Sequence, residues 1–486
     1  MMTLSRRDFL QGSYINRPIE QAIPANQNPN LHLLNRISWG ARPEDVARIN
    51  QIGPETYLDE QLNPEQLDDS LLEAKLFKLP ILSMDRRTIY GLSMGEERTY
   101  RALLQAMLLR SVYSERQLLE RVVEFWADHF NVPLNIDYAP DMLIYQRDVI
   151  RRHALGNFRD LLMATAKSPA MLIYLDNFVN IAEAPNENYA RELLELHTLG
   201  VDGGYTEADI KEVSRAFTGW TTHDGALTGF YFDEDNHDTG LKQLLGHTLP
   251  ADRGIEDGLH VLMILAHHPA TAQFICRKLC QRFVSDTPPE SLVTQLATIW
   301  QQHRGEIKPV LRALFLSNEF QDAAGAKYRR PLDFFVGALR ATGTAIYEDE
   351  VGYEMLDALG QVPYNWRAPD GYPDDAQTWI NTNGLLTRWN IAMALTHGAY
   401  SDVELSTAFK TALPDKLGTP QSVGGLVDNV ALQVFGQPLA DPEKAQFVNY
   451  ASDGQGADTP VTTHLFARKA GSLYGLMLAS PLYQWR

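Results

Sequence analysis

The chain has 486 residues, of which 44% are hydrophobic, which is enough to form a large buried core. Asp and Glu number 61 against 43 Lys and Arg, so the formal net charge is −18. A nucleic-acid-binding surface needs clustered Lys and Arg, and the sequence has only short basic pairs, so no nucleic-acid partner is expected. No run of about 18 apolar residues occurs, so we also expect no membrane-spanning helix.

Residues 1–30 are rich in Asn, Pro and Gln and predict a flexible N-terminal arm. Within it, Arg6 and Arg7 resemble the twin-arginine export signature. A signal peptide continues with roughly 7–15 apolar residues, whereas the residues that follow here are polar and include Pro18. The expected localisation is therefore either cytoplasmic or, if Arg6 and Arg7 act as an export signal, periplasmic.

From residue 31 onward, apolar residues recur every three or four positions. This pattern predicts a mainly α-helical protein, a multi-helix globular array that forms one domain over residues 31–486, with a softer division near 325–345. Several predicted helices begin at a proline followed by acidic residues, as at Pro43, which is typical of a first helical turn.

One region breaks the helical period. Residues 229–233 have the composition of a strand, residues 234–240 that of a turn, and residues 241–245 that of a returning strand. We therefore predict one small β-hairpin near 228–246, inserted into the helical body. A second irregular segment, residues 362–376, is rich in proline, aromatics and aspartate, and long loops of this kind are often functional.

The helix predicted over residues 186–200 carries the densest set of polar side chains. At about 100° per residue, Asn188, Arg191 and Glu192 share one face, whereas His197 lies on the apolar side. Ordinary exposed ion pairs would also account for the polar face. A histidine on an apolar face must find a partner, which favours a fixed polar network.

A second predicted helix, residues 115–131, repeats this arrangement. His129 lies on its apolar side, and Glu124 and Asp128 lie opposite. A single inward histidine is usually a core residue with a satisfied ring, but two inward histidines near carboxylates favour a shared polar pocket. Convergence of His129 and His197 and separate core positions for the two rings both remain open from the sequence.

Established metal and nucleotide motifs do not support a cofactor. The two helices lack the Glu-x-x-His pairs of di-iron bundles, and His-Glu-x-x-His is absent. Residues 233–244 lack the glycine and glutamate that a calcium loop requires. His237 and Asp238 are the candidate metal ligands, if any metal binds, or they cap backbone amides in a turn. Phosphate loops and the dinucleotide fingerprint are missing, so no nucleotide cofactor is expected.

Blocks along most of the chain resemble the bacterial family catalogued as domain of unknown function 1800. The matching blocks are 33–40, 53–62, 125–132, 186–200, 214–220, 237–242 with 245–246, 268–269, 330–331, 359–363 and 379–380. The most specific block reads Asn-Glu-Asn-Tyr-Ala-Arg-Glu-Leu-Leu-Glu-Leu, from residue 186. The resemblance implies no established activity, but it implies frequent twin-arginine signals and a gene neighbour similar to alkaline phosphatases and sulfatases.

Two functions are compatible with these residues. The first is an enzyme with hydrolase-like acid–base chemistry on an anionic or polar substrate, in a pocket built from His129, the 186–200 helix and the 233–242 hairpin. The second is a non-catalytic scaffold or partner of a secreted phosphatase- or sulfatase-like protein, in which the same residues form a buried polar network. For the enzyme, the expected catalytic residues are His129, Glu192, His197, His237 and Asp238, and the expected substrate-binding residues are Asn188, Arg191, Arg215, Trp220 and Lys242.

Overall fold

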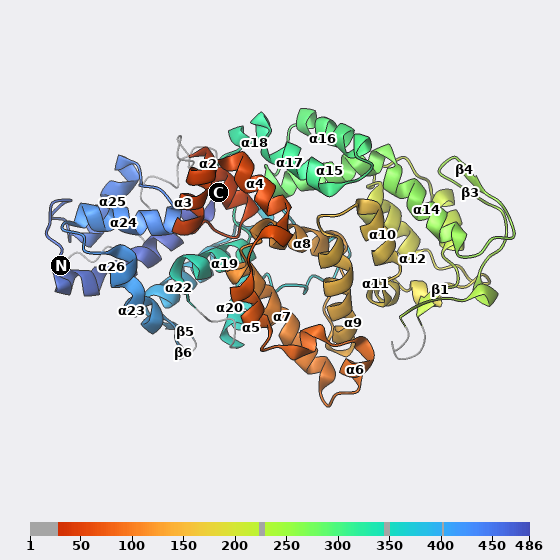
Figure 1. Ribbon diagram of the computed structural model, residues 1–486, viewed down its shortest axis with the longest axis horizontal. Coiled ribbons are helices and arrows are strands. Elements are labelled where there is room, and N and C mark those ends of the chain that lie inside the picture. Colours follow the sequence, from red (N-terminus) through yellow and green to blue (C-terminus); the bar gives the residue numbers. More distant parts are fainter. Residues whose placement is uncertain (1–27, 223–228, 345–349, 401–402) are drawn as a thin grey trace.

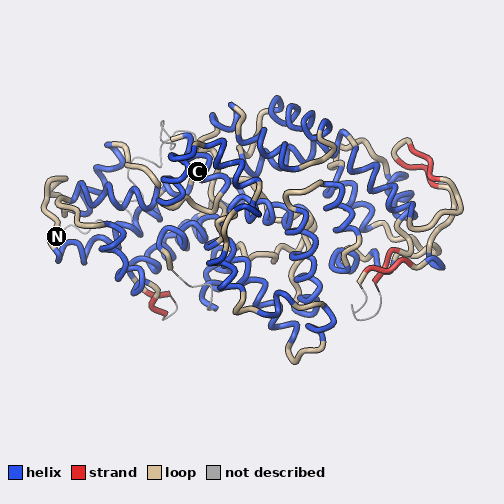
Figure 2. Tube along the Cα trace, in the orientation of Figure 1, coloured by secondary structure: helices blue, strands red, loops and turns tan. Residues whose placement is uncertain are grey.

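The computed structural model describes residues 28–222, 229–344, 350–400 and 403–486. These residues form a mainly helical protein with short strand pairs, which confirms the predicted fold class (Figures 1 and 2). Arg6 and Arg7, and nearly all of the predicted N-terminal arm, lie outside the described residues. The organisation of residues 31–486 as one domain stays a prediction.

The first half of the chain contains the helices that carry most of the predicted site residues. They are α2 (Pro29–Ile37), α3 (Pro43–Ile52), α4 (Pro54–Leu62), α5 (Ser70–Leu76), α6 (Arg86–Tyr90), α7 (Gly95–Tyr113), α8 (Gln117–His129), α9 (Ala139–Ile144), α10 (Phe158–Ala166), α11 (Pro169–Tyr174), α12 (Asn188–Glu192) and α13 (Glu207–Ala216). Two π-helical segments extend α9 and α12, namely η5 (Tyr145–Arg151) and η7 (Leu193–Thr198). Short 3-10 turns lie at η2 (Pro64–Gln66), η3 (Pro80–Ser83), η4 (Ile136–Tyr138), η6 (Asn177–Val179) and η9 (Glu234–Asn236).

The second half is also helical. Its helices are α14 (Glu256–His267), α15 (Pro269–Phe283), α16 (Glu290–Gln302), α17 (Ile307–Phe315), α18 (Asn318–Asp322), α19 (Pro331–Thr342), α20 (Glu350–Leu359), α21 (Ala376–Trp379), α22 (Thr382–His397), α23 (Ser406–Leu417), α24 (Val423–Phe435), α25 (Asp441–Ala451), α26 (Thr463–Ala479) and α27 (Pro481–Gln484). Proline in the first turn begins many of them, including α3, α15 and α19, because the fixed φ of proline suits a position whose N–H has no helical partner.

The strands form three antiparallel pairs within the described ranges. They are β1 (Trp220–Thr222) with β2 (Phe230–Phe232), β3 (Lys242–Leu244) with β4 (His247–Leu249), and β5 (Ala399–Tyr400) with β6 (Val403–Glu404). The predicted region near 228–246 does contain strands, but the expected pairing of its two strands with each other is wrong. Each pairs instead with a neighbour outside the predicted hairpin, because the tight turn at Leu245 and Gly246, both at positive φ, returns the chain directly onto β3.

Two clusters of buried hydrophobic residues hold the helices together. The larger contains residues from α2 to α18, and the other is built mainly on α19, α22, α24 and α26. Helix α7 contributes side chains to both clusters, and α8 lies beside it near the middle of the molecule (Figure 1). The C-terminal residue Arg486 returns to this middle region, where its side chain donates to the carbonyl of Asn35 on α2.

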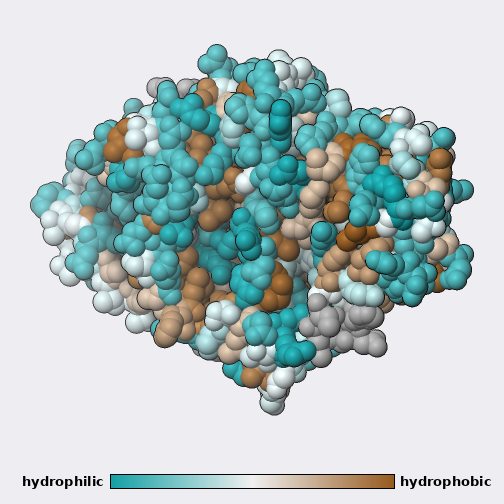
Figure 3. Space-filling view, turned by 45° about the vertical axis from the view of Figure 1, so that its right-hand side comes forward, coloured by the Kyte–Doolittle hydropathy of each residue, from teal (hydrophilic) through white to brown (hydrophobic). Residues whose placement is uncertain are grey.

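The surface is mostly hydrophilic, with smaller apolar patches on the face drawn in Figure 3. No single helix in the described part of the chain is both long enough and apolar enough to cross a membrane. Helices α14 and α15 reach that length and composition only as a pair, and they meet at an angle of 61°.

Candidate functional site

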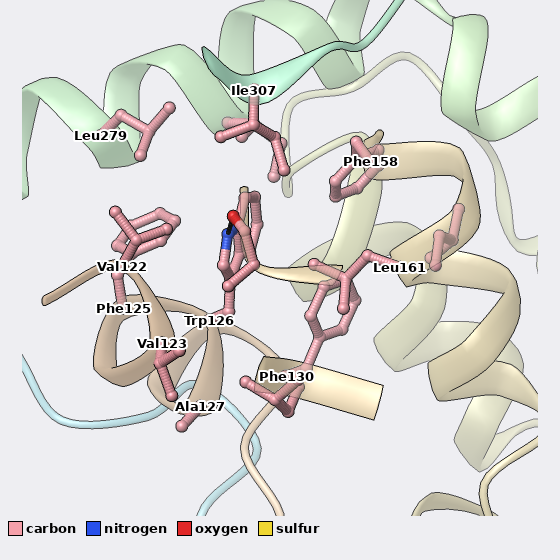
Figure 4. Packing of buried hydrophobic residues seen from close by; sticks show 14 of the residues in the cluster. Val122, Val123, Phe125, Trp126, Ala127, Phe130, Phe158, Leu161, Leu279 and Ile307 are labelled. Atoms are coloured by element: carbon pink, nitrogen blue, oxygen red, sulfur yellow. Dashed lines mark hydrogen bonds between the residues drawn. The ribbon is translucent and has the colours of Figure 1, made fainter. Parts of the chain in front are cut away.

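Helix α8 separates a hydrophobic core from a charged pocket. Its apolar face carries Phe125 and Trp126 (Figure 4). The Trp126 ring lies 5.8 Å from the ring of Phe158 on α10, whereas Phe125 lies on the side of Leu279 of α15. The indole Nε1 of Trp126 donates to the carbonyl of Ala154 at 3.0 Å, so its one polar atom is satisfied. This packing fixes the rotation of α8 about its axis and thereby directs the opposite face.

The opposite face of α8 presents three carboxylates to a pocket. Glu120, Glu124 and Asp128 are spaced four residues apart, so they follow one line along the helix. The facing wall comes from residues 360–375, which we call the cover loop, through Tyr364 and Tyr372. The enclosed interior is small, about 30 Å³, or roughly two water molecules.

Two buried arginines connect α8 to distant parts of the chain. Arg330, at the start of α19, binds Glu124 and also Asp128, with Nη1 and Oδ2 of the latter pair 3.0 Å apart. Arg282, on α15, binds Glu124 and reaches Asp374 of the cover loop at 2.9 Å. The pocket wall is therefore held by charge-assisted bonds between α8, α15, α19 and the cover loop.

Asp128 is a pocket carboxylate whose pKa is displaced upwards from its usual value. Burial raises the pKa of Asp128 to about 6. The positive charge of Arg330 acts to lower this pKa, and the negative charge of Asp374 acts to raise it. Gly371 of the cover loop has φ +75°, and a Cβ there would lie 2.1 Å from the Asp128 carbonyl oxygen. The loop thus contacts the Asp128 backbone closely, and only glycine fits at this position.

Lys278 approaches the same region from α15. Phe274, Lys278 and Arg282 are spaced by four residues, so Lys278 lies between the ring that contacts His129 and the guanidinium that binds Asp374. Its ammonium makes no hydrogen bond or ion pair with the residues that the structure describes, and its nearest ring, Phe274, is 5.7 Å away. Burial lowers the pKa of Lys278, and the aspartates of the pocket oppose this shift.

His129 and His197 lie together, as one of the two sequence interpretations anticipates. Their ring centroids are 6.2 Å apart, and Nε2 of His129 donates to the His197 carbonyl at 3.1 Å. Both side chains are buried among aromatic rings, each 1% exposed. Burial and then Lys278 lower the pKa of His197 to about 3 and that of His129 well below its usual value. Both rings are neutral and sealed from solvent, so neither contacts a substrate in this conformation.

The residues predicted on the hairpin form a separate polar network. His237 donates from Nδ1 to the Thr218 carbonyl at 2.8 Å, and its Nε2 lies 3.6 Å from Oδ2 of Asp257. The same carboxylate oxygen accepts from Lys242 at 2.7 Å. Asp238 is bound by both the Nε and Nη2 atoms of Arg215, at 2.7 and 3.0 Å. In the described ranges, this network has no hydrogen bond, ion pair or ring contact with His129 or His197.

The polar face of α12 is more exposed than the pocket. Arg191 pairs with Glu207 at 2.8 Å and lies within 3.5 Å of Glu195, and Asn188 is exposed. Burial and then the charge of Glu195 raise the pKa of Glu192. Trp220, predicted to bind substrate, is fully buried and packs against the backbone of Gly258.

The match to a known family covers nearly the whole chain. Residues 32–485 fit the family described as "Protein of unknown function (DUF1800)". The chain belongs to this family. A comparison with curated proteins and one with solved structures found no match for this DUF1800 protein. Its matched region includes α8, α15, α19 and the cover loop, so the pocket lies within the family's own sequence.

None of the ten residues proposed from the sequence lines this pocket. Their catalytic and binding roles remain predictions, and the described residues contain no group of three or more His, Cys, Asp or Glu side chains that could hold a metal. Glu124 and Asp128 were predicted to lie on the polar face of their helix. The irregular segment predicted at 362–376, of a kind that is often functional, overlaps most of the cover loop. Arg282 and Lys278 carried no signal, because their role depends on which helices meet in space.

Proposed function

We propose that this DUF1800 protein is an acid–base enzyme with hydrolase-like chemistry, and that its active site is the pocket between α8 and the cover loop. The observation that supports the proposal is the pKa of Asp128, about 6, at a position that lines the pocket. Acid–base catalysts function best with a pKa near the working pH, and perturbed groups in pockets are typical of active sites.

In this proposal, Asp128 accepts a proton from an attacking water and returns it to the leaving group. Arg330 holds the carboxylate in place, since its guanidinium also binds Glu124 and is fixed from two sides. Lys278 supplies a second titratable group whose pKa burial moves in the opposite direction.

The size of the pocket supports a catalytic cycle in which the cover loop opens. An interior that admits roughly two waters is too small for most substrates, so Tyr364 or Tyr372 must move aside for binding. Closure would then exclude water from around Asp128. Three carboxylates and one arginine line the pocket, so the end near Asp128 suits a neutral or cationic polar group.

Turnover of a panel of p-nitrophenyl esters and glycosides tests the proposal. We expect Asp128→Asn to lower kcat/KM by roughly 100- to 10,000-fold, and the wild-type rate to change with an inflection near pH 6. Asp137→Asn makes the same chemical change at an exposed carboxylate and should turn over like the wild type. A wild-type protein inactive on the whole panel, or an unaffected Asp128→Asn variant, would reject this site.

A second candidate function is a non-catalytic scaffold, and the completeness of the ion network favours it. Glu124 and Asp128 already have arginine partners, and the two histidines are sealed, as expected for residues that fix helix positions. A scaffold needs no titrating carboxylate. It therefore predicts that Asp128→Asn changes stability alone, with no pH-dependent turnover in any variant.

A further inference from the structure

Gln361 has a buried polar atom that the protein leaves without a partner. The residue lines the pocket between α8 and the cover loop and is 1% exposed. Its Nε2 makes no hydrogen bond with any residue that the structure describes, whereas its Oε1 accepts from the backbone N–H of Leu332 at 2.9 Å. A buried amide N–H without a partner costs free energy, because it has given up its hydrogen bonds to water. Gln361 therefore supplies one free donor at the wall of the pocket.

Helix α19 fixes the orientation of this side-chain amide. Leu332 is the second residue of α19, so its N–H has no carbonyl partner within the helix. Exchanging Oε1 and Nε2 would place two donors against each other, so Nε2 is the free end of the amide. The backbone N–H of Gln361 also donates to the Leu356 carbonyl at 3.1 Å. Contacts with α19 and α20 thus hold the donor in place at the very start of the cover loop.

Other polar side chains that line the pocket have partners of their own. Glu120 binds Arg151 through both of its carboxylate oxygens, at 2.8 and 2.6 Å. The hydroxyl groups of Ser111 and Tyr372 donate to backbone carbonyls, at 2.9 and 2.8 Å. None of these groups bonds to Nε2 of Gln361. The acceptor that Nε2 lacks is therefore an oxygen atom inside the pocket, from water or from a ligand.

We propose that Nε2 of Gln361 binds the carbonyl oxygen of an uncharged ester or amide substrate. A carbonyl oxygen accepts from an N–H without adding a hydrogen that needs an acceptor of its own. A carboxylate, phosphate or sulfate group would instead lie against the carboxylates of Glu120, Glu124 and Asp128. The meaning of this ligand as a substrate rests on the proposed function, and it narrows the hydrolase-like chemistry to bonds beside a carbonyl group.

Two ligands of nearly the same shape test this donor. Acetanilide has a carbonyl group where N-ethylaniline has a methylene, and both are uncharged at neutral pH. Each is titrated into the full-length protein, and ligand-observed NMR measures its dissociation constant. We expect the affinity ratio to favour acetanilide roughly 10-fold more in the wild type than in Gln361→Met, because only acetanilide gives Nε2 an acceptor. The same ratio in both proteins, or no binding of acetanilide by the wild type, would overturn the inference, since Nε2 would then bind water alone.

Gln61→Met is the matched control. Gln61 is also buried, and its Oε1 accepts from the N–H of Leu118, the second residue of α8, at 3.1 Å. Its Nε2, however, already donates to the Glu115 carbonyl at 2.9 Å. Both substitutions remove an acceptor from the first turn of a helix, so both should lower stability to a similar degree. Gln61→Met should keep the wild-type affinity ratio, and an equal change of ratio in the two variants would contradict a specific role for Gln361.

The binding measurements separate this inference from the proposed function. If the affinity ratio depends on Gln361 and Asp128→Asn loses no turnover, the catalytic role of Asp128 is wrong while the carbonyl site stands. If Asp128→Asn loses turnover and the ratio does not depend on Gln361, only the carbonyl site is wrong. On p-nitrophenyl acetate, Gln361→Met should lower kcat/KM by roughly 10- to 100-fold, and Gln61→Met should turn over like the wild type.

Discussion

The buried environment of His129 and His197 makes protonation of either ring energetically unfavourable at acid pH. Nδ1 of His129 and Nε2 of His197 have no hydrogen-bond partner in the described part of the chain. Lys278 lies near enough that its charge lowers the pKa of both rings, after burial, which is the larger cause. Protonating either ring would add a positive charge to a buried site that already faces one.

We expect His197→Gln to reduce the acid sensitivity of the fold. The pKa of His197 falls from 6.5 in the unfolded chain to about 3 in the folded protein. Between these values the unfolded chain binds a proton that the folded protein does not, so the stabilisation is full above pH 6.5 and is lost as the pH falls towards 3. From pH 7 to pH 5 the loss amounts to about 2 kcal/mol for this residue. Urea unfolding at both pH values measures it.

The exposed residue His464 provides the control for this measurement. His464→Gln should lose as much stability between pH 7 and pH 5 as the wild type, whereas His197→Gln should lose about 2 kcal/mol less. The comparison uses only the difference between the two pH values, so any packing cost of the substitution cancels. Equal losses in all three proteins would show that His197 is not held neutral by its surroundings.

At the scale of elements, the cover loop contains two glycines at positive φ, and the space around them differs. Gly360 has φ +83° and open space where a Cβ would lie, whereas Gly371 has φ +75° and meets the Asp128 carbonyl oxygen. A side chain at either position costs about 1–2 kcal/mol for the left-handed backbone. At Gly371 the loop must also move away from α8.

We therefore expect Gly371→Ala to release the cover loop and Gly360→Ala to leave it in place. The loop contains the exposed residue Arg367, after which trypsin can cleave. Limited trypsin digestion should cut Gly371→Ala at this residue several times faster than Gly360→Ala, although both variants lose stability. Equal cleavage rates would mean that the contact between Gly371 and Asp128 does not hold the loop closed.

Local sequence patterns predict where helices begin, but they do not predict features that depend on packing between elements. The helix start at Pro43 was predicted correctly, because proline and the apolar period act within one or two turns. The helix predicted over 186–200 becomes π-helical from Leu193, and that change depends on packing against neighbouring helices. Strand pairing near 228–246 was wrong for a similar reason, since composition indicates a strand but does not choose its partner.

At the scale of the whole molecule, the candidate site could be predicted only in parts. The acidic face of α8, the block at 330–331 and the cover loop were each identified from the sequence. Their assembly was not, because Arg330 and Glu124 are separated by 206 positions and a periodic pattern carries no information on such a contact. The polar face that looked most like an active site, that of α12, instead lies in exposed ion pairs.

Asp333 joins the two hydrophobic clusters through charge, so its loss should weaken the whole molecule. Its buried carboxylate binds Arg121 of α8 and, at 2.9 Å, Arg486 at the C-terminal end. Burial would raise the pKa of Asp333, but these arginines lower it well below its usual range. Asp333→Asn leaves buried guanidinium groups without their counter-ion, and we expect the free energy of unfolding in urea to fall by about 3–5 kcal/mol.

Asp453→Asn is the control. Asp453 pairs with Lys469 at 2.6 Å, but its carboxylate is half-exposed, so this substitution should cost less than about 1 kcal/mol. Similar losses in the two variants would contradict a central role for Asp333.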